Sequence, residues 1–233
     1  MGKGNCSFQE RAAAGGRPKL FYELKLCYNE TMKRVVLKSP VADYAAMIER
    51  MAEIGSEFEP AVWQQERIYL PADFKPRNNQ PRLVVRTEVV NPEEQANYYL
   101  FLKRHIEDSG IDYVHQTTIG DPVAMEEIAH QLGYRKVAEL NRQRQSVLLD
   151  DYTVLHLDTV EGMSTSWLKI EQEIVSDLPV SVVQAGLFQT LRLLGLSTFV
   201  LQTYAELSLN PAQPYYLPEP EVSMENDEIS SQL

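Results

Sequence analysis

Side chains able to bind metal ions and anions gather on one face of three consecutive predicted strands. The strands are expected at 140–149, 152–159 and 167–173, where polar and apolar residues largely alternate and a strand would place them on opposite faces. One face of this group carries Arg142, Arg144, Ser146, His156, Asp158, Lys169, Glu171 and Glu173. Guanidinium groups bind oxyanions, and carboxylates bind hard divalent cations. The pattern predicts a cavity that holds metal and a polyanion or, as the alternative, a charged sheet face in water.

The elements that would position these side chains are antiparallel strands joined as a meander. The opposite face of the three strands is largely apolar, as expected where a sheet covers a hydrophobic core. Similar alternation predicts further strands at 20–28, 58–70, 82–90, 98–104 and 111–119. The charged candidates on them are Glu23, Lys25, Arg82, Arg86, Glu88 and Lys103.

Helices are predicted between and after the strands, at 39–55, 121–133 and 178–207. The first two begin at Ser39-Pro40 and Asp121-Pro122, where the polar residue caps the helix and proline takes its first position. Each of these two is expected to end at a glycine. The third is expected to be interrupted at Gly195.

Composition limits the classes of partner. The chain has 233 residues, a net charge of −11 and a pI near 4.9, which argue against extended nucleic-acid binding. No apolar run approaches the roughly 20 residues that cross a bilayer, and the N-terminus lacks a signal-peptide core. We therefore expect a cytoplasmic protein without membrane contact. The expected organisation is a flexible leader at 1–18, one domain at 19–209 and a disordered acidic tail at 210–233.

Several short motifs follow one another in a characteristic order. They are Phe21-Tyr22-Glu23-Leu24-Lys25, Leu83-Val84-Val85-Arg86, Leu100-Phe101-Leu102-Lys103, Leu132-Gly133-Tyr134, Arg142-Gln143-Arg144, the segment 157–162 and Ile170-Glu171-Gln172-Glu173. This series resembles the CYTH superfamily, the triphosphate tunnel enzymes that include class IV adenylyl cyclases, thiamine triphosphatases and inorganic triphosphatases. The resemblance covers roughly residues 20 to 207.

The resemblance implies an α+β protein, an eight-stranded antiparallel β-barrel with flanking helices, whose inward cations grip a triphosphate. The implied activity is metal-dependent hydrolysis of inorganic, nucleoside or thiamine triphosphate, with Mg²⁺ or Mn²⁺ as the cofactor. The implied catalytic residues are Glu23, Lys25 and Glu171, and the implied phosphate ligands are Lys25, Arg86, Lys103, Arg142 and Arg144. The implied metal ligands are Glu23, Asp158, Glu171 and Glu173.

Departures from the family pattern leave other functions open. Phe21 stands where the family's opening motif has its first glutamate, and Val84 where the next motif has an arginine. A tunnel that keeps its cations but lacks these groups would bind a phosphate or nucleotide ligand without turnover, and an adenylyl cyclase is a further alternative. The expected partner is a small-molecule polyphosphate, and a homodimer stays open. Repulsion among inward cations predicts that Arg144→Ala does not destabilise the empty protein.

Overall fold

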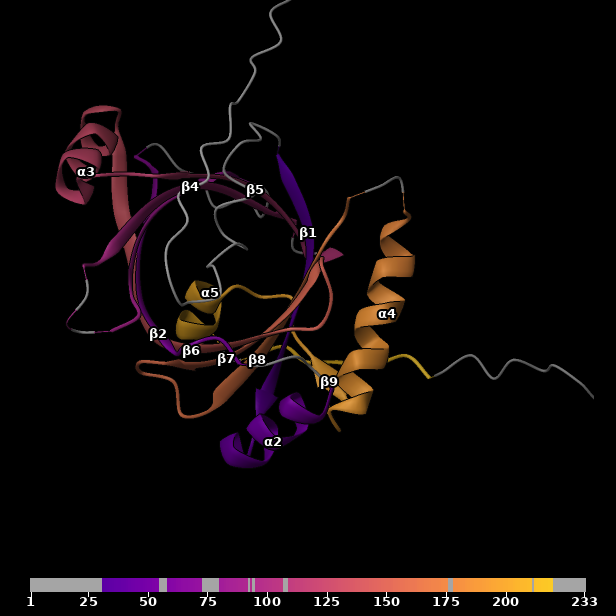
Figure 1. The fold of residues 1–233 in the computed structure, drawn as a ribbon. Coiled ribbons are helices and arrows are strands. Elements are labelled where there is room, and N and C mark those ends of the chain that lie inside the picture. Colours follow the sequence, from indigo (N-terminus) through magenta and orange to yellow (C-terminus); the bar gives the residue numbers. More distant parts are fainter. Residues whose placement is uncertain are drawn as a thin grey trace, which may run out of the picture. The chain divides into compact units, whose positions relative to one another are not determined.

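Eight antiparallel strands close into a barrel in the computed structural model of the chain (Figure 1). Around the barrel the hydrogen-bonded order is β1, β5, β4, β3, β2, β6, β7 and β8. The strands are β1 Met32–Val41, β2 Val62–Pro71, β3 Arg82–Val89, β4 Asn97–Ile106, β5 Ile111–Thr118, β6 Tyr134–Leu148, β7 Thr153–Val160 and β8 Ser166–Glu173. The structure describes residues 31–54, 58–72, 80–91, 93, 95–106, 109–175, 178–210 and 212–219.

Strand β1 closes the barrel because it pairs along both of its edges. Its first half pairs with β5, where Arg34 lies opposite Asp112, and most of its length pairs with β8, where Lys38 lies opposite Lys169. The predicted eight-stranded antiparallel barrel is thus confirmed. These strands complete the barrel without the predicted strand at 20–28, which lies outside the described residues.

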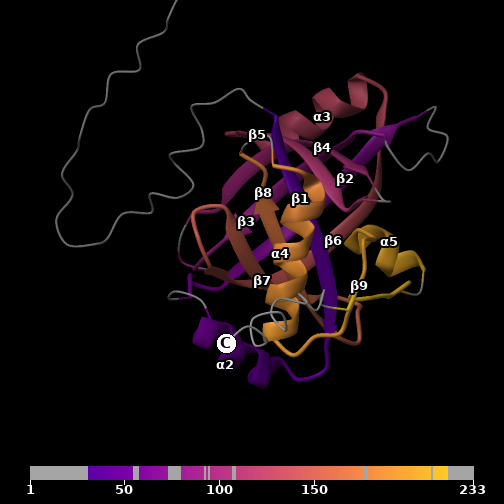
Figure 2. The same ribbon diagram turned by 90° about the vertical axis from the view of Figure 1, so that its right-hand side faces the viewer.

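Alternation along the strands separates an apolar outer core from a charged interior. On β8, Leu168 and Ile170 belong to an outer core that also contains residues of α2 (Tyr44–Ile54) and α4 (Val180–Leu193). Lys169, between them in sequence, lines a cavity inside the barrel. Figure 2 shows α4 running along the outside of β1 and β8. A slip of one residue would exchange the two faces, so burial beneath the helices fixes the register of these strands.

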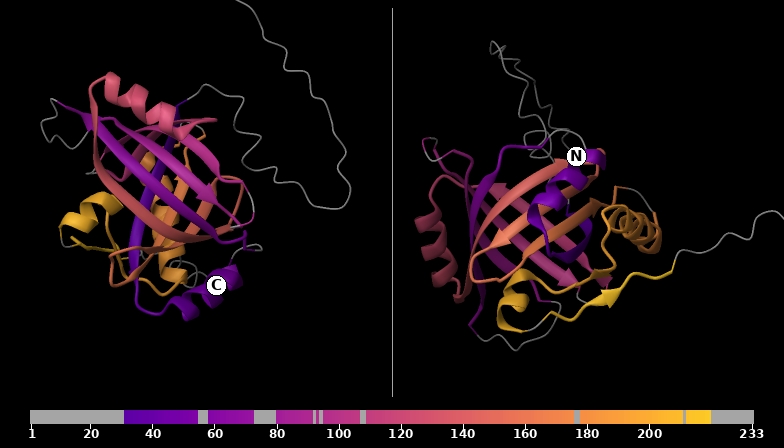
Figure 3. Two further views of the ribbon diagram at one scale, coloured as in Figure 1. Left: turned by 90° about the vertical axis from the view of Figure 1, so that its left-hand side faces the viewer. Right: turned by 90° about the horizontal axis from the view of Figure 1, so that it is seen from below.

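Helices α2 and α3 (Pro122–Gln131) begin at side-chain caps, and one predicted start is wrong. Helix α3 begins as predicted, with Asp121 accepting hydrogen bonds from two backbone N–H groups of the first turn. Ser39 and Pro40 instead belong to β1, because pairing with β8 keeps the backbone extended through Val41. Asp43 Oδ1 accepts from the N–H of Ala46 at 3.0 Å at the start of α2. Helices α2 and α3 lie at opposite sides of the barrel (Figure 3).

The chain after α4 differs from the helical segment predicted between Gly195 and residue 207. Thr198–Phe199 forms the short strand β9, and Val200 exchanges two backbone hydrogen bonds with Lys38 of β1. This pairing holds the segment extended, so the last helix, α5, covers only Tyr204–Leu209. Strand β10 (Tyr215–Tyr216), where no strand was predicted, pairs with β9. None of the helices in the described ranges has the length and hydropathy that a membrane crossing requires.

Candidate functional site

The interior of the barrel holds a cavity, here called the tunnel, with a strong excess of positive charge. Its lining contains seven cationic side chains and two carboxylates. The cations are Lys38, Arg82, Arg86, Lys103, Arg142, Arg144 and Lys169, and the carboxylates are Glu66 and Asp112. Each of the eight barrel strands contributes at least one charged side chain to the interior, because successive side chains along a strand point to opposite faces of the sheet.

Three of the cations converge on Glu66. Arg86 Nε donates to Glu66 Oε1 at 2.8 Å, Arg142 Nη2 donates to the same oxygen at 3.1 Å, and Lys103 Nζ lies 3.2 Å from it. Burial alone would raise the pKa of Glu66, but the charges of Arg142, Lys103 and Arg86 hold it well below its usual value. The cluster has a net positive charge even with Glu88, which bonds Arg86 at 3.1 Å.

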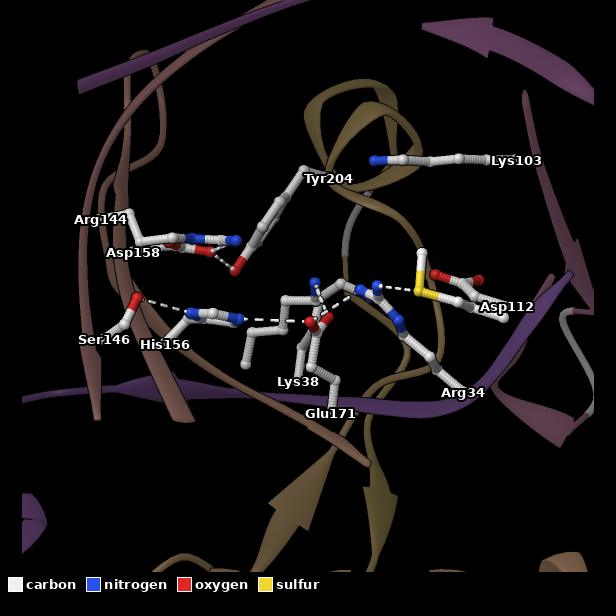
Figure 4. A network of polar contacts seen from close by, with 12 residues as sticks. Arg34, Lys38, Lys103, Asp112, Arg144, Ser146, His156, Asp158, Glu171 and Tyr204 are labelled. Atoms are coloured by element: carbon white, nitrogen blue, oxygen red, sulfur yellow. Dashed lines mark hydrogen bonds and ion pairs between the residues drawn. The ribbon is translucent and has the colours of Figure 1, made fainter. Parts of the chain in front are cut away.

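A second group contains a buried ion pair between Arg144 and Asp158. Arg144 donates to both oxygens of Asp158, at 2.7 and 2.6 Å, and Asp158 is 0% exposed. Burial would raise the pKa of Asp158, yet the adjacent guanidinium of Arg144 lowers it. The hydroxyl of Tyr204, which comes from α5, donates to the same carboxylate at 2.8 Å. Figure 4 shows this group on the barrel wall.

Glu171 is the centre of a third group of polar contacts (Figure 4). Its carboxylate accepts from Arg34 Nη1 at 3.0 Å and also bonds Lys169 Nζ. His156 Nε2 lies 3.4 Å away, and its Nδ1 is 2.8 Å from Ser146 Oγ. Burial and the nearby Arg144 charge lower the pKa of His156 to about 3, so this imidazole is neutral at physiological pH.

The segment that enters α5 closes one part of the tunnel. Lys38 Nζ donates to the backbone carbonyl of Gln202 at 2.8 Å, and Arg82 bonds Thr203 Oγ1 and Glu206 Oε1 at 3.1 and 3.2 Å. Among the described residues, no carboxylate lies within ion-pair distance of Lys38. Burial lowers the pKa of Lys38 to about 8.

Comparison with known proteins identifies the family. The CYTH domain family model matches residues 32–200. The chain belongs to the CYTH family. No curated protein sequence matches it.

Solved structures with this CYTH fold share little sequence with the chain. PH1819 from Pyrococcus horikoshii OT3 has a TM-score of 0.67 at 21% identity, covering 76% of this chain and 98% of its own. HpAC1 from Hippeastrum, a putative adenylyl cyclase with a dominant triphosphatase activity, has a TM-score of 0.52 at 14% identity. The match covers 76% of this chain and 95% of HpAC1. A chain of the Schizosaccharomyces pombe Mediator head module has a TM-score of 0.55 at 15% identity, with 70% and 95% covered. At such identities these neighbours show the fold.

The family match begins at β1, which bears on the predicted opening motif. Glu23 and Lys25 lie before residue 32 and outside the described residues. In β1 the alternate positions that share a face with Lys38 are Arg34 and Val36, and Val36 and Lys38 line the tunnel. The first strand of the matched CYTH domain therefore presents no carboxylate to the tunnel.

The described residues do not fit the Mg²⁺ or Mn²⁺ ion that the family resemblance implies. Within these ranges no group of three or more His, Cys, Asp or Glu side chains is arranged to hold a metal ion. The inward carboxylates Glu66, Asp158 and Glu171 each already bond arginine or lysine. A divalent cation at any of them would be repelled by these neighbours and would have to displace their hydrogen bonds.

The predicted site residues fall into three groups. Arg86, Lys103, Arg142 and Arg144 line the tunnel together, and their role as phosphate ligands stays a prediction. Asp158 and Glu171 are bonded to Arg144 and Lys169 of the lining, and Glu173 lies at the end of β8 opposite Arg34. Glu23 and Lys25 are outside the described residues.

The expectation of unrelieved repulsion among the inward cations is wrong. Sequence alternation identified the cations but missed Glu66, which neutralises part of their charge. The signal was present, since Gln64, Glu66 and Ile68 alternate along β2. Arg34 and Lys38 were missed because no strand was predicted over 32–41, where Ser39-Pro40 was expected to begin a helix.

Proposed function

We propose that this CYTH protein binds a small molecule carrying a di- or triphosphate in its tunnel, through arginine and lysine and without a divalent metal ion. The observation that carries the proposal is the lining, with seven cationic side chains against two carboxylates. Carboxylates neutralise these closely spaced buried cations only in part, and a polyanion would relieve the repulsion that remains. A small molecule fits better than a nucleic acid, because the cations lie inside a barrel and the chain carries a net charge of −11.

The types of cation suit phosphate groups. Arginine offers a planar fork for two oxygens of one phosphate, and lysine offers a point charge that adapts to a second one. Arg86, Arg142 and Lys103 already bind one carboxylate together, so a phosphate oxygen could replace or join Glu66 at the same donors. Arginine and lysine thereby supply the charge neutralisation that a metal ion gives to other triphosphate sites.

Calorimetric titration with inorganic tripolyphosphate tests this proposal. Binding should persist in EDTA and should not tighten when Mg²⁺ is added in excess over the chelator. Arg142→Ala should weaken binding at least tenfold, because it removes a two-point phosphate donor. The matched control is Arg135→Ala on the same strand, where the arginine is exposed. The absence of tripolyphosphate binding by the wild type, or equal binding by both variants, would contradict the proposal.

Metal-dependent triphosphate hydrolysis is the second candidate. Family membership supports it, and the structural neighbour HpAC1 has a dominant triphosphatase activity. The shared fold does not assign that chemistry by itself, since a Mediator chain has the fold as well. Binding or phosphate release that is lost in EDTA and restored by Mg²⁺ or Mn²⁺ would favour this candidate. Formation of a cyclic nucleotide from ATP in the same assays would favour an adenylyl cyclase.

A further inference from the structure

A histidine and an aspartate form a pair in the tunnel lining that anion binding alone does not use. His105 of β4 and Asp112 of β5 are register partners, and His105 Nδ1 lies 2.6 Å from Asp112 Oδ1. His105 is 4% exposed, and both residues line the tunnel. Its second nitrogen, Nε2, is buried and has no hydrogen-bond partner among the described residues. A buried polar atom without a partner is unfavourable, which points to a bound group that completes its hydrogen bonding.

The pairing fixes which nitrogen can accept a proton. Burial would raise the pKa of Asp112, but the hydrogen bond from His105 and the charge of Lys38 lower it, so Asp112 is a carboxylate. A carboxylate can only accept, and the neutral imidazole therefore carries its proton on Nδ1. Nε2 is then a proton acceptor, which fits a water molecule or hydroxyl better than an anionic phosphate oxygen.

Cations suited to phosphate belong to the same cavity lining as His105. Lys103 is two positions away on the same face of β4, and Lys38 and Arg82 line the same cavity. A water held by His105 beside a phosphate held by these cations has the arrangement of a nucleophile next to its electrophile. We propose that His105 is a general base for hydrolysis of a phosphoanhydride bond in the tunnel, an activity that needs no divalent metal. The inference rests on the proposed binding of a polyphosphate.

The step is balanced with groups that the chain supplies. The water oxygen forms a bond to the terminal phosphorus while one water proton moves to His105 Nε2. The bond from phosphorus to the bridging oxygen breaks, and its electron pair stays on the leaving phosphate, where the lysine and arginine side chains neutralise the charge. His105 then returns its proton to the leaving phosphate or to solvent. Asp112 is a positioning residue, because it holds the imidazole in the accepting tautomer.

The test compares turnover with binding in the same variants. Phosphate release from tripolyphosphate is measured in EDTA for the wild type, His105→Asn, Asp112→Asn and His115→Asn, and tripolyphosphate affinity is measured by calorimetry. General-base catalysis contributes roughly 10² to 10⁴-fold, so His105→Asn should lose at least ~100-fold in kcat. Its Kd for tripolyphosphate should change less than about threefold, since Nε2 is not expected to bind phosphate. Asp112→Asn should also lower kcat, with a smaller effect on KM.

The control and the contrary outcomes separate this inference from the binding proposal. His115 is exposed on β5 and contacts Thr31, so His115→Asn should keep the wild-type rate. Added imidazole should restore part of the turnover of His105→Gly. Tripolyphosphate binding without phosphate release in EDTA, or wild-type release by His105→Asn, overturns the general base and leaves the binding proposal intact. A wild-type protein that does not bind tripolyphosphate overturns the binding proposal itself.

Discussion

Replacement of Glu66 by glutamine should lower the stability of the ligand-free protein and raise its affinity for polyphosphate. Glu66 is 6% exposed and is the shared partner of Arg86, Arg142 and Lys103. Removing one partner of a buried ion pair costs about 3–5 kcal/mol. The lower end applies here. Lys103, whose pKa burial lowers to about 7, can lose its proton, and Arg86 keeps Glu88.

The expected loss converts into a measurable shift in melting temperature. For a domain of this size 1 kcal/mol corresponds to roughly 2–4 °C, so a loss of about 3 kcal/mol lowers Tm by about 6–12 °C. Tripolyphosphate at 100 times its Kd adds about 2.7 kcal/mol to the native state of the wild type. It should add more to Glu66→Gln, because the variant lacks a negative charge that repels the ligand. The difference in Tm between the wild type and Glu66→Gln should therefore become smaller as the concentration of tripolyphosphate rises.

Thermal and urea unfolding with and without tripolyphosphate provide the measurement. Glu139→Gln is the control, since Glu139 is an exposed glutamate that pairs with Lys136 on β6. The pKa of Glu66 is depressed in the folded state, so its stabilisation is fully present above the unfolded pKa of about 4.3 and is lost as pH falls through the folded value. The stabilising role of Glu66 would be refuted if Glu66→Gln were as stable as the wild type at pH 7. Its effect on ligand binding would be refuted if tripolyphosphate left the difference in stability between the two proteins unchanged.

Three further predictions follow from the buried groups. Arg144→Ala should destabilise the protein by about 3–5 kcal/mol in urea unfolding, because it leaves the enclosed carboxylate of Asp158 without its cation; an unchanged midpoint would contradict this. Tyr204→Phe should cost about 1.5–3 kcal/mol in the same assay, through loss of a hydrogen bond to that carboxylate, and a loss below 0.5 kcal/mol would show that this bond contributes little. Burial lowers the pKa of Lys103 to about 7, so a bound anion should raise it again. Tripolyphosphate binding at pH 8 should then take up protons and weaken as pH rises, and calorimetry in buffers of different ionisation enthalpy should show no uptake for Lys103→Arg if this residue is the source.

The sequence predicted most of the barrel because period-two alternation is a local signal. The strands from 82–90 to 167–173 were placed within two residues at each end, except that β6 begins at Tyr134, six residues before the predicted start. The inward faces of β6 and β7 follow from the spacing of Arg142, Arg144, His156 and Asp158. The cap at Asp121 is equally local, since its side chain bonds the N–H groups of the next turn. Short-range patterns of this kind survive folding because the barrel interior and the outer core impose the same alternation.

The failures involve pairings between residues far apart in the chain. Ser39-Pro40 has the local chemistry of a helix start, but hydrogen bonds from β8 and from Val200 hold the segment in β1. The role of Glu66 depends on three other strands that bring cations to it, and no feature of β2 alone reports them. Asp158 and Glu171 were predicted to bind metal from their residue types, and the structure shows that each of them is bonded by arginine or lysine. Which side chain bonds a given carboxylate depends on how the strands pair in the folded barrel, and the alternation along one strand does not show that.

The double pairing of β1 also determines how late the chain can fold. Ribosomal synthesis delivers β1 before the seven other barrel strands of the described residues, whereas its partner β8 is the last of them and Val200 follows later still. Until they arrive, the growing sheet has two unpaired edges, and the cations of its inner face are open to water and to other anions. Pairing between such distant segments is slow, because the chain loses conformational entropy on closing the long loop before the stabilising contacts form. Chains that end before Val200 are therefore expected to associate through their unpaired strand edges. Cellular anions would bind the exposed cations of the inner face until β8 and Val200 pair with β1.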